Sequence, residues 1–219
     1  GFVFNQNPEK RLSSSENKET IKVKKNKTNN EMMRANQTAA PKISVRKAAT
    51  VGILSAAAFL LQLLGTVMPF KVGGFLEVEF SDLPAIIGTF SMGPVCGVLI
   101  ELIKNLLKCA FTTTGFVGEL ANFIINGIFV LTAGVIYSRK RTRRGAVLGL
   151  SAAVIAMSAA GIFTNLYILL PLYMPTAELS AKLAIVLSVI TPFNLIKGAV
   201  LSVVTYFIYK PLSPIIKGK

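Results

Sequence analysis

A long succession of apolar segments constrains this chain more than any other feature. From residue 48 to 209, apolar runs are interrupted mainly by glycine, proline and short charged clusters. Hydrophobic residues make up 52% of the sequence and the mean hydropathy is +0.58, which is too apolar for a water-soluble domain of this size. The pattern therefore predicts an all-α integral membrane protein with about six helices and no separate soluble domain.

Turn and cap residues divide the apolar part of the chain into segments. They predict helices over residues 46–68, 83–92, 95–110, 117–138, 145–170 and 181–209. The second helix is too short for the roughly 20 residues needed to span a bilayer, so it must be buried against its neighbours. Ser81 or Asp82 is suited to cap it, and Pro84 suits its first turn. We expect this membrane domain to cover residues 46–212.

The basic residues are concentrated in three regions. Of 24 Lys and Arg residues, 11 lie in residues 1–47, five lie in residues 139–144, and three lie in the last ten residues. If these regions face the cytoplasm, 19 of the 24 follow the positive-inside rule. Topology then explains the net charge of +14, and we expect no nucleic-acid partner. Both termini are expected on the cytoplasmic side of a bacterial plasma membrane.

The two ends of the chain are polar. Residues 1–45 are rich in Lys, Asn, Ser and Thr and have few aromatic residues, which is typical of a disordered segment. We expect a basic cytoplasmic tail held near anionic lipid headgroups. Residues 213–219 are expected to form a second, short cytoplasmic tail.

The sequence contains no recognisable catalytic motif. It has no histidine, which excludes histidine metal sites and histidine acid–base catalysis. A phosphate-binding GxxxxGK[ST] loop, GxSxG, HExxH and CxxC are also absent. We therefore expect that the chain is not an enzyme, binds no metal and carries no cofactor.

Three polar residues in the apolar segments indicate a ligand site. A lysine at the centre of a membrane helix costs about 2.5–3.5 kcal/mol, so Lys197 needs a polar partner or a polar cavity. Asn194 lies three residues before it, and Asn165 lies one apolar segment earlier. Amides offer a donor and an acceptor side by side, whereas an ammonium only donates. This set suits a flat ring with a carbonyl, N–H, carbonyl edge.

Other polar residues in these segments have structural interpretations. Asn122 and Asn126 lie four residues apart, and hydrogen bonding between helices accounts for them about as well as a ligand does. Glu101, Lys104 and Lys108 share one helix face. For these three we expect an internal Glu101–Lys104 ion pair, with Lys108 reaching the lipid headgroups.

A ridge of small residues runs along the first predicted helix. Ala48, Gly52 and Ala56 recur at intervals of four, and such ridges let another helix approach closely. From the sequence alone, packing within this protein is about as good an explanation as an interface with a partner protein.

Several stretches together resemble one transporter family. They are residues 75–85, Gly93-Pro94, residues 114–118 with Asn122, residues 165–167 with Pro171 and Tyr173, and residues 192–198 (Pro-Phe-Asn-Leu-Ile-Lys-Gly), the last being the most specific. The chain resembles, over about residues 46–212, the substrate-binding S-components of energy-coupling-factor (ECF) vitamin transporters, especially the riboflavin-specific ones. The basic tail lies outside the resemblance.

The resemblance implies a six-helix transmembrane bundle with a ligand site near the outer face. Riboflavin would be the transported ligand, and a membrane scaffold subunit with two ATPase subunits would supply the energy. The implied substrate-binding residues are Asn165, Asn194, Lys197, Leu76, Glu77, Val78, Asn122 and Tyr167. The implied scaffold-facing residues are Ala48, Gly52 and Ala56.

Other functions remain open at this point. An S-component for a different vitamin is the nearest alternative. A membrane enzyme or lipid-handling protein is disfavoured because no catalytic constellation is present. A channel is disfavoured because the polar residues form one cluster without repeated charged rings.

Overall fold

The computed structural model describes residues 22, 24–29, 44–67, 71–72, 76–77, 80–112 and 115–217. The chain forms two units, Gly1–Ser44 and Val45–Lys219. In the first unit, the described residues 22 and 24–29 are helical and exposed. Most of the predicted disordered tail lies outside the described residues, so its disorder stays a prediction.

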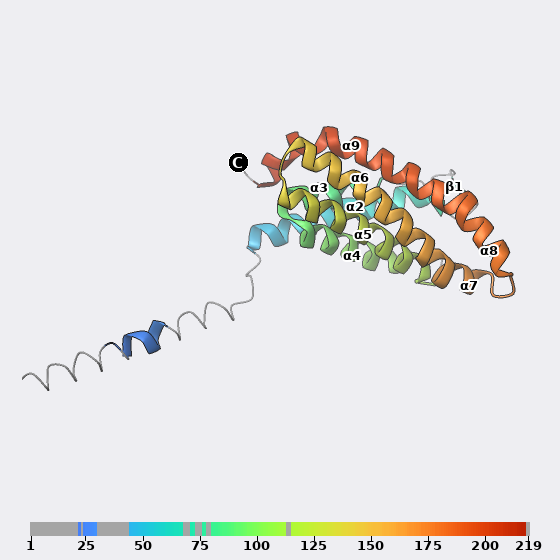
Figure 1. The fold of residues 1–219 in the computed structure, drawn as a ribbon, viewed down its shortest axis with the longest axis horizontal. Helices are drawn as coiled ribbons and strands as arrows, with labels where there is room; N and C mark the ends of the chain where they lie inside the picture. The colour runs from blue at the N-terminus through green and yellow to red at the C-terminus, as the bar shows by residue number, and fades with distance from the viewer. Residues whose placement is uncertain are drawn as a thin grey trace, which may run out of the picture. The chain divides into compact units, whose positions relative to one another are not determined.

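The described part of the second unit consists of helices joined by turns, with one short hairpin (Figure 1). The helices are α2 (Val45–Val67), α3 (Leu83–Met92), α4 (Pro94–Cys109), α5 (Val117–Arg139), α6 (Arg143–Thr164), α7 (Leu170–Tyr173), α8 (Leu179–Ile185) and α9 (Thr191–Lys217). Two π-helical segments, η1 (Asn165–Leu169) and η2 (Val186–Ile190), join α6 to α7 and α8 to α9. Between α2 and α3, the strands β1 (Lys71–Val72) and β2 (Leu76–Glu77) pair antiparallel, with Lys71 opposite Glu77.

Four helical stretches of the described residues are long and apolar enough to cross a membrane. They are Val45–Gly65, Val117–Arg139, Arg143–Tyr173 and Leu179–Pro211. The last two were predicted over 145–170 and 181–209, and each is two or three residues longer at both ends and contains a π-helical segment. The other helix bounds agree with the predicted ones to within one or two residues.

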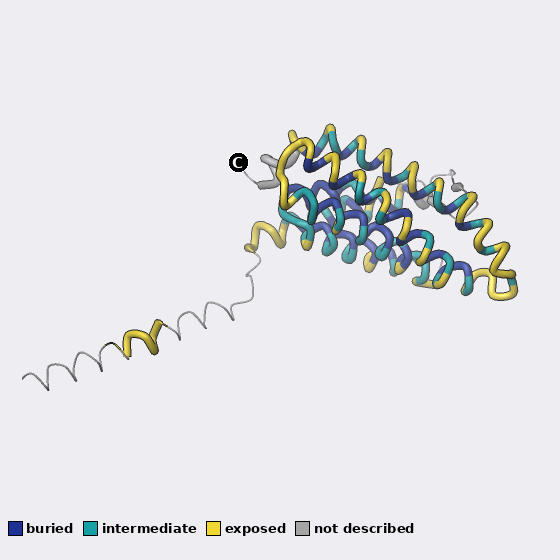
Figure 2. Tube along the Cα trace, in the orientation of Figure 1, coloured by how far each residue is buried: buried dark blue, intermediate teal, exposed yellow. Residues whose placement is uncertain are grey.

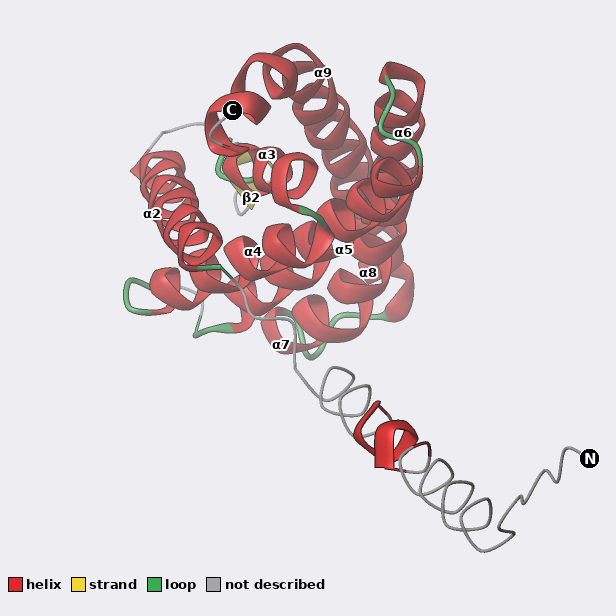
Figure 3. Cartoon of the chain, turned by 90° about the vertical axis from the view of Figure 1, so that its left-hand side faces the viewer, coloured by secondary structure: helices red, strands yellow, loops and turns green. Residues whose placement is uncertain are grey.

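Helix α3 lies in the middle of the helical unit. Eight of its ten residues are buried. Figure 3 shows α2, α4, α5 and α9 around it, and α3 contacts all four. Glycines allow this close approach: a Cβ added to Gly97 of α4 or Gly134 of α5 would collide with Thr89 of α3.

The core joins α3 to the longer helices. Buried and exposed residues alternate along the long helices (Figure 2). At the C-terminal end of α3, Phe90 stacks on Tyr137 with a centroid distance of 4.3 Å and meets Tyr209 edge-on at 5.3 Å. Large apolar side chains such as Ile53 and Phe207 are about 70% exposed, as expected for helices that face lipid rather than water.

Candidate functional site

The site is built around the start of α3. A tight turn precedes the helix, with Leu83 N donating to the Phe80 carbonyl at 3.1 Å. Asp82 occupies the predicted N-cap position, but its side chain makes no capping hydrogen bond. The carboxylate is fully buried and faces two lysines instead. The prediction that this side chain caps the helix was therefore wrong.

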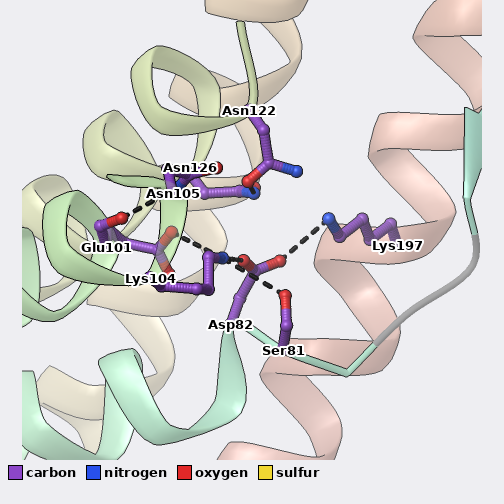
Figure 4. A network of polar contacts seen from close by, with 8 residues as sticks. All are labelled: Ser81, Asp82, Glu101, Lys104, Asn105, Asn122, Asn126 and Lys197. Atoms are coloured by element: carbon purple, nitrogen blue, oxygen red, sulfur yellow. Dashed lines mark hydrogen bonds and ion pairs between the residues drawn. The ribbon is translucent and has the colours of Figure 1, made fainter. Parts of the chain in front are cut away.

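Four ionisable side chains from three parts of the fold meet here, and we call Asp82, Glu101, Lys104 and Lys197 the charge cluster (Figure 4). Lys104 Nζ of α4 lies 2.6 Å from Asp82 Oδ1 and 2.7 Å from Glu101 Oε2. It also donates to Ser81 Oγ at 3.2 Å. Lys197 Nζ of α9 lies 2.8 Å from Asp82 Oδ2.

The charge cluster is almost completely buried. The side chains of Asp82, Glu101 and Lys104 have no exposed surface, and that of Lys197 is 10% exposed. Removing water from each ion costs several kcal/mol, and the mutual attraction offsets this only when every charge keeps its partner. Each ion of the cluster therefore needs its direct partner.

The sequence predicted half of this cluster. The Glu101–Lys104 ion pair is confirmed. Lys108 was expected to reach the lipid headgroups, but its side chain is buried, so that prediction was wrong. The Asp82–Lys197 pair was missed because its members are far apart in the sequence. The available signal was that each is a solitary charge beside or inside an apolar helix.

The two predicted ligand-binding amides meet at one glycine. Asn165 Nδ2 donates to the Gly161 carbonyl at 2.7 Å, one turn earlier in the same helical stretch. A Cβ built on Gly161 would lie 2.5 Å from Asn194 Nδ2, so the Asn194 side chain packs where Gly161 has none. Both asparagines are buried. The fold thus brings Asn165 and Asn194 together, with Lys197 one turn beyond Asn194.

A second group of amides lies beside the charge cluster (Figure 4). Asn126 Nδ2 donates to Asn122 Oδ1 at 3.0 Å, within α5 rather than between helices. Asn105 Nδ2 donates to the Glu101 carbonyl at 2.8 Å. The Oδ1 atoms of Asn105 and Asn126 are buried and accept no hydrogen bond from the described residues. These oxygens can accept hydrogen bonds from a ligand or from water.

The remaining predicted ligand contacts are less closely defined. Tyr167 is 68% exposed and stacks on Phe163 at a centroid distance of 6.3 Å. Leu76 and Glu77 form β2, in the connection that ends at Asp82. Val78 lies outside the described residues. These positions stay predictions.

The small-residue ridge faces outward. Ala48, Gly52 and Ala56 are all exposed, and a Cβ added to Gly52 would meet nothing within 4 Å. Packing against another helix of the described chain therefore does not explain the ridge.

The site offers recognition rather than catalysis. Among the described residues, no group of three or more His, Cys, Asp or Glu side chains is placed to hold a metal ion. Buried amides and a neutralised ammonium can orient a polar ring edge through hydrogen bonds, and the surrounding helices supply an apolar environment.

The sequence is similar to a known family of membrane proteins and to named members of it. Residues 46–209 match the family model described as ECF transporter, substrate-specific component. The chain is 38% identical over 172 residues to the riboflavin transporter RibU of Staphylococcus aureus (strain TCH60), covering 77% of this chain and 90% of the relative. It is 34% identical over 180 residues to the riboflavin transporter FmnP of Bacillus subtilis (strain 168), covering 78% and 94%.

A solved structure is similar as well. It is described as the S component of a bacterial ECF transporter and aligns with a TM-score of 0.67 at 38% identity. The alignment covers 78% of this chain and 97% of that one. The similarity therefore extends over nearly the whole of the solved protein.

Proposed function

This chain belongs to the substrate-specific components of ECF transporters, and on that premise we propose that it binds riboflavin at the membrane and delivers it for uptake. Two relatives that align over most of their length, at 38% and 34% identity, are named riboflavin transporters. A transporter component of this kind needs no catalytic residues of its own, in agreement with the absence of catalytic motifs from the sequence.

The main support for the proposed ligand site is that Asn165 and Asn194 meet at Gly161, one helical turn from Lys197. Two amides and an ammonium can hydrogen-bond the carbonyl and imide edge of the flavin ring. We propose that Asn122 and Tyr167 also line the site, and that residues 76–78 cover it. The position of β2 in the connection that ends at Asp82 supports this covering role.

The proposed assembly includes other proteins. The six-helix membrane domain would dock on a scaffold subunit energised by two ATPase subunits, because this chain has no phosphate-binding loop of its own. The exposure of Ala48, Gly52 and Ala56 supports the ridge as the docking surface. The three basic regions favour cytoplasmic termini in the bacterial plasma membrane, with lipid around the remaining helix faces.

Spectroscopy of the purified protein tests the proposed ligand. Protein purified in mild detergent is expected to carry the visible absorption of flavin, or to quench riboflavin fluorescence when the vitamin is added. Titration with a panel of other water-soluble vitamins separates riboflavin from the alternative S-component specificities. Folded protein that is colourless and fails to bind added riboflavin would overturn the proposal.

A further inference from the structure

We infer that Asp82 is a positioning residue of the ligand site, whose carboxylate fixes and neutralises the Lys197 ammonium. The inference rests on the proposed function, because it assigns a role to a residue that acts on the ligand only through Lys197. The contact itself is a 2.8 Å ion pair between Lys197 Nζ and Asp82 Oδ2.

The Asp82 carboxylate is itself rigidly held. Its two oxygens are divided between two lysines, with Oδ1 facing Lys104 and Oδ2 facing Lys197. Lys104 is held in turn by Glu101 at 2.7 Å and by Ser81 at 3.2 Å. Figure 4 shows the two lysines approaching the carboxylate from opposite sides. Because the Asp82 side chain has no exposed surface, no exchange with bulk water competes for these contacts.

Lys197 needs such an anchor to act in recognition. A lysine side chain has four rotatable methylene links and a compact charge, so fixing it in one place costs conformational entropy. Asn194 lies on the same face of α9 one turn earlier and is located by its packing against Gly161. The Asp82 oxygen therefore sets the distance between the amine and the amides that meet at Gly161.

The contact of the Lys197 ammonium with the Asp82 carboxylate affects which ligands the site can accept. The Lys197 ammonium already faces the Asp82 carboxylate when no ligand is bound. Such an amine favours an uncharged carbonyl group, because an additional anion would meet the nearby Asp82 carboxylate. An uncharged flavin ring edge fits this chemistry, and a carboxylate does not.

A double-mutant cycle on purified protein tests the inference. Riboflavin affinity is measured by fluorescence titration for the wild type, Asp82→Asn, Lys197→Met and the double variant. Asp82→Asn is expected to weaken binding by roughly tenfold or more, as for loss of an interaction with a charged group. In the Lys197→Met background the same change is expected to have little effect, because the positioned group is gone.

Glu101→Gln serves as the matched control. It removes the same charge from the charge cluster but leaves the Asp82–Lys197 contact in place, so its effect on binding should be smaller than that of Asp82→Asn. Equal effects of the two variants would indicate a general electrostatic contribution and overturn the positioning role.

The double variant keeps the test decisive if Asp82→Asn alone fails to fold. In it, Lys104 retains Glu101 and neither Asp82 nor Lys197 leaves an unmatched charge. Equal affinities of the double variant and Lys197→Met support the inference, and a further large loss in the double variant overturns it.

Wild-type protein that fails to bind riboflavin would refute the proposed function instead. Binding that weakens with Lys197→Met but not with Asp82→Asn would refute only the role of Asp82.

Discussion

The charge cluster around Asp82 and the small-residue ridge of α2 differ in where their partners lie. Asp82, Glu101 and Lys104 are completely buried, and Lys104 pairs with Glu101 on its own helix and with Asp82 at the start of α3. Ala48, Gly52 and Ala56 are exposed, and nothing in the described chain lies within 4 Å of a Cβ placed on Gly52. The first region is completed by this chain itself, whereas the second can be completed only by lipid or by another protein.

This difference determines which experiment reports on each region. A substitution in the charge cluster alters contacts within the chain, so it should change stability or ligand binding of the purified protein. A substitution on the ridge leaves internal contacts intact, so its effect should appear only in the assembled transporter. Four substitutions test that division, in order of decreasing effect on the purified protein.

Lys104→Met should produce the largest effect. It leaves two buried carboxylates, Asp82 and Glu101, without their shared cation. Loss of one member of a buried ion pair typically costs about 3–5 kcal/mol of stability. Unfolding of the protein by heat or denaturant in mild detergent measures the change in stability. Lys210→Met, at an exposed lysine of α9, is the control and should be close to neutral. Equal stabilities of the two variants would mean that the cluster is not an internal structural element.

Lys197→Met should weaken riboflavin binding by about 1.5–3 kcal/mol, the range for a hydrogen bond to a charged group. Insertion of α9 should be at least as favourable, because a costly charge is removed from the membrane. Asp82 keeps its contact with Lys104, so folding should be affected less than by Lys104→Met. Flavin fluorescence quenching measures the affinity. Unchanged affinity in a well-folded variant would remove Lys197 from the ligand site.

Gly161→Ala should have a smaller effect, confined to binding. The added Cβ would displace the Asn194 amide, which lies at the flexible end of a side chain, so the backbone need not move. Loss of one ligand hydrogen bond corresponds to about 1 kcal/mol. Gly127→Ala in α5 is the control, because its Cβ would make only an ordinary 3.8 Å contact with Phe123. If the two variants bind riboflavin equally well, Asn194 does not act from its position beside Gly161.

Gly52→Leu should have the smallest effect on the purified protein. Its side chain would enter open space, so stability and riboflavin binding should match the wild type. Uptake by cells should nevertheless fall, because a leucine prevents the close helix approach that small residues allow. Ala159→Leu, at an exposed position of α6, is the control and should leave uptake intact. Normal uptake with Gly52→Leu would show that the ridge faces lipid.

Helix positions could be predicted from the sequence because their signals are local. Pro94 and the apolar runs place most helix ends to within a few residues. The π-helical form of η1 and η2, which lie inside the predicted helices, could not be predicted, since π-helical turns have no strong sequence signature and depend on tertiary packing.

Only the part of the site that depends on local sequence could be predicted. Glu101 and Lys104 are three residues apart on one helix, so their ion pair follows from helix geometry. Asp82 and Lys197 meet only through the arrangement of α3 against α9, which no local pattern specifies. A preference for capping was therefore assigned to Asp82, although tertiary contacts override it.

The π-helical segment η2 precedes Asn194 and Lys197 and thereby sets the face that they present. A π turn accommodates one more residue than an α turn, and each residue of an α-helix rotates the chain by about 100°. Loss of a single codon within residues 186–190 would convert the π segment into a regular α-helix and leave the directions of Asn194 and Lys197 nearly unchanged. The same loss within residues 191–193, after η2, would turn both side chains by about 100° relative to the helix before them. The π segment is thus a place where the chain tolerates a change of length close to the ligand site.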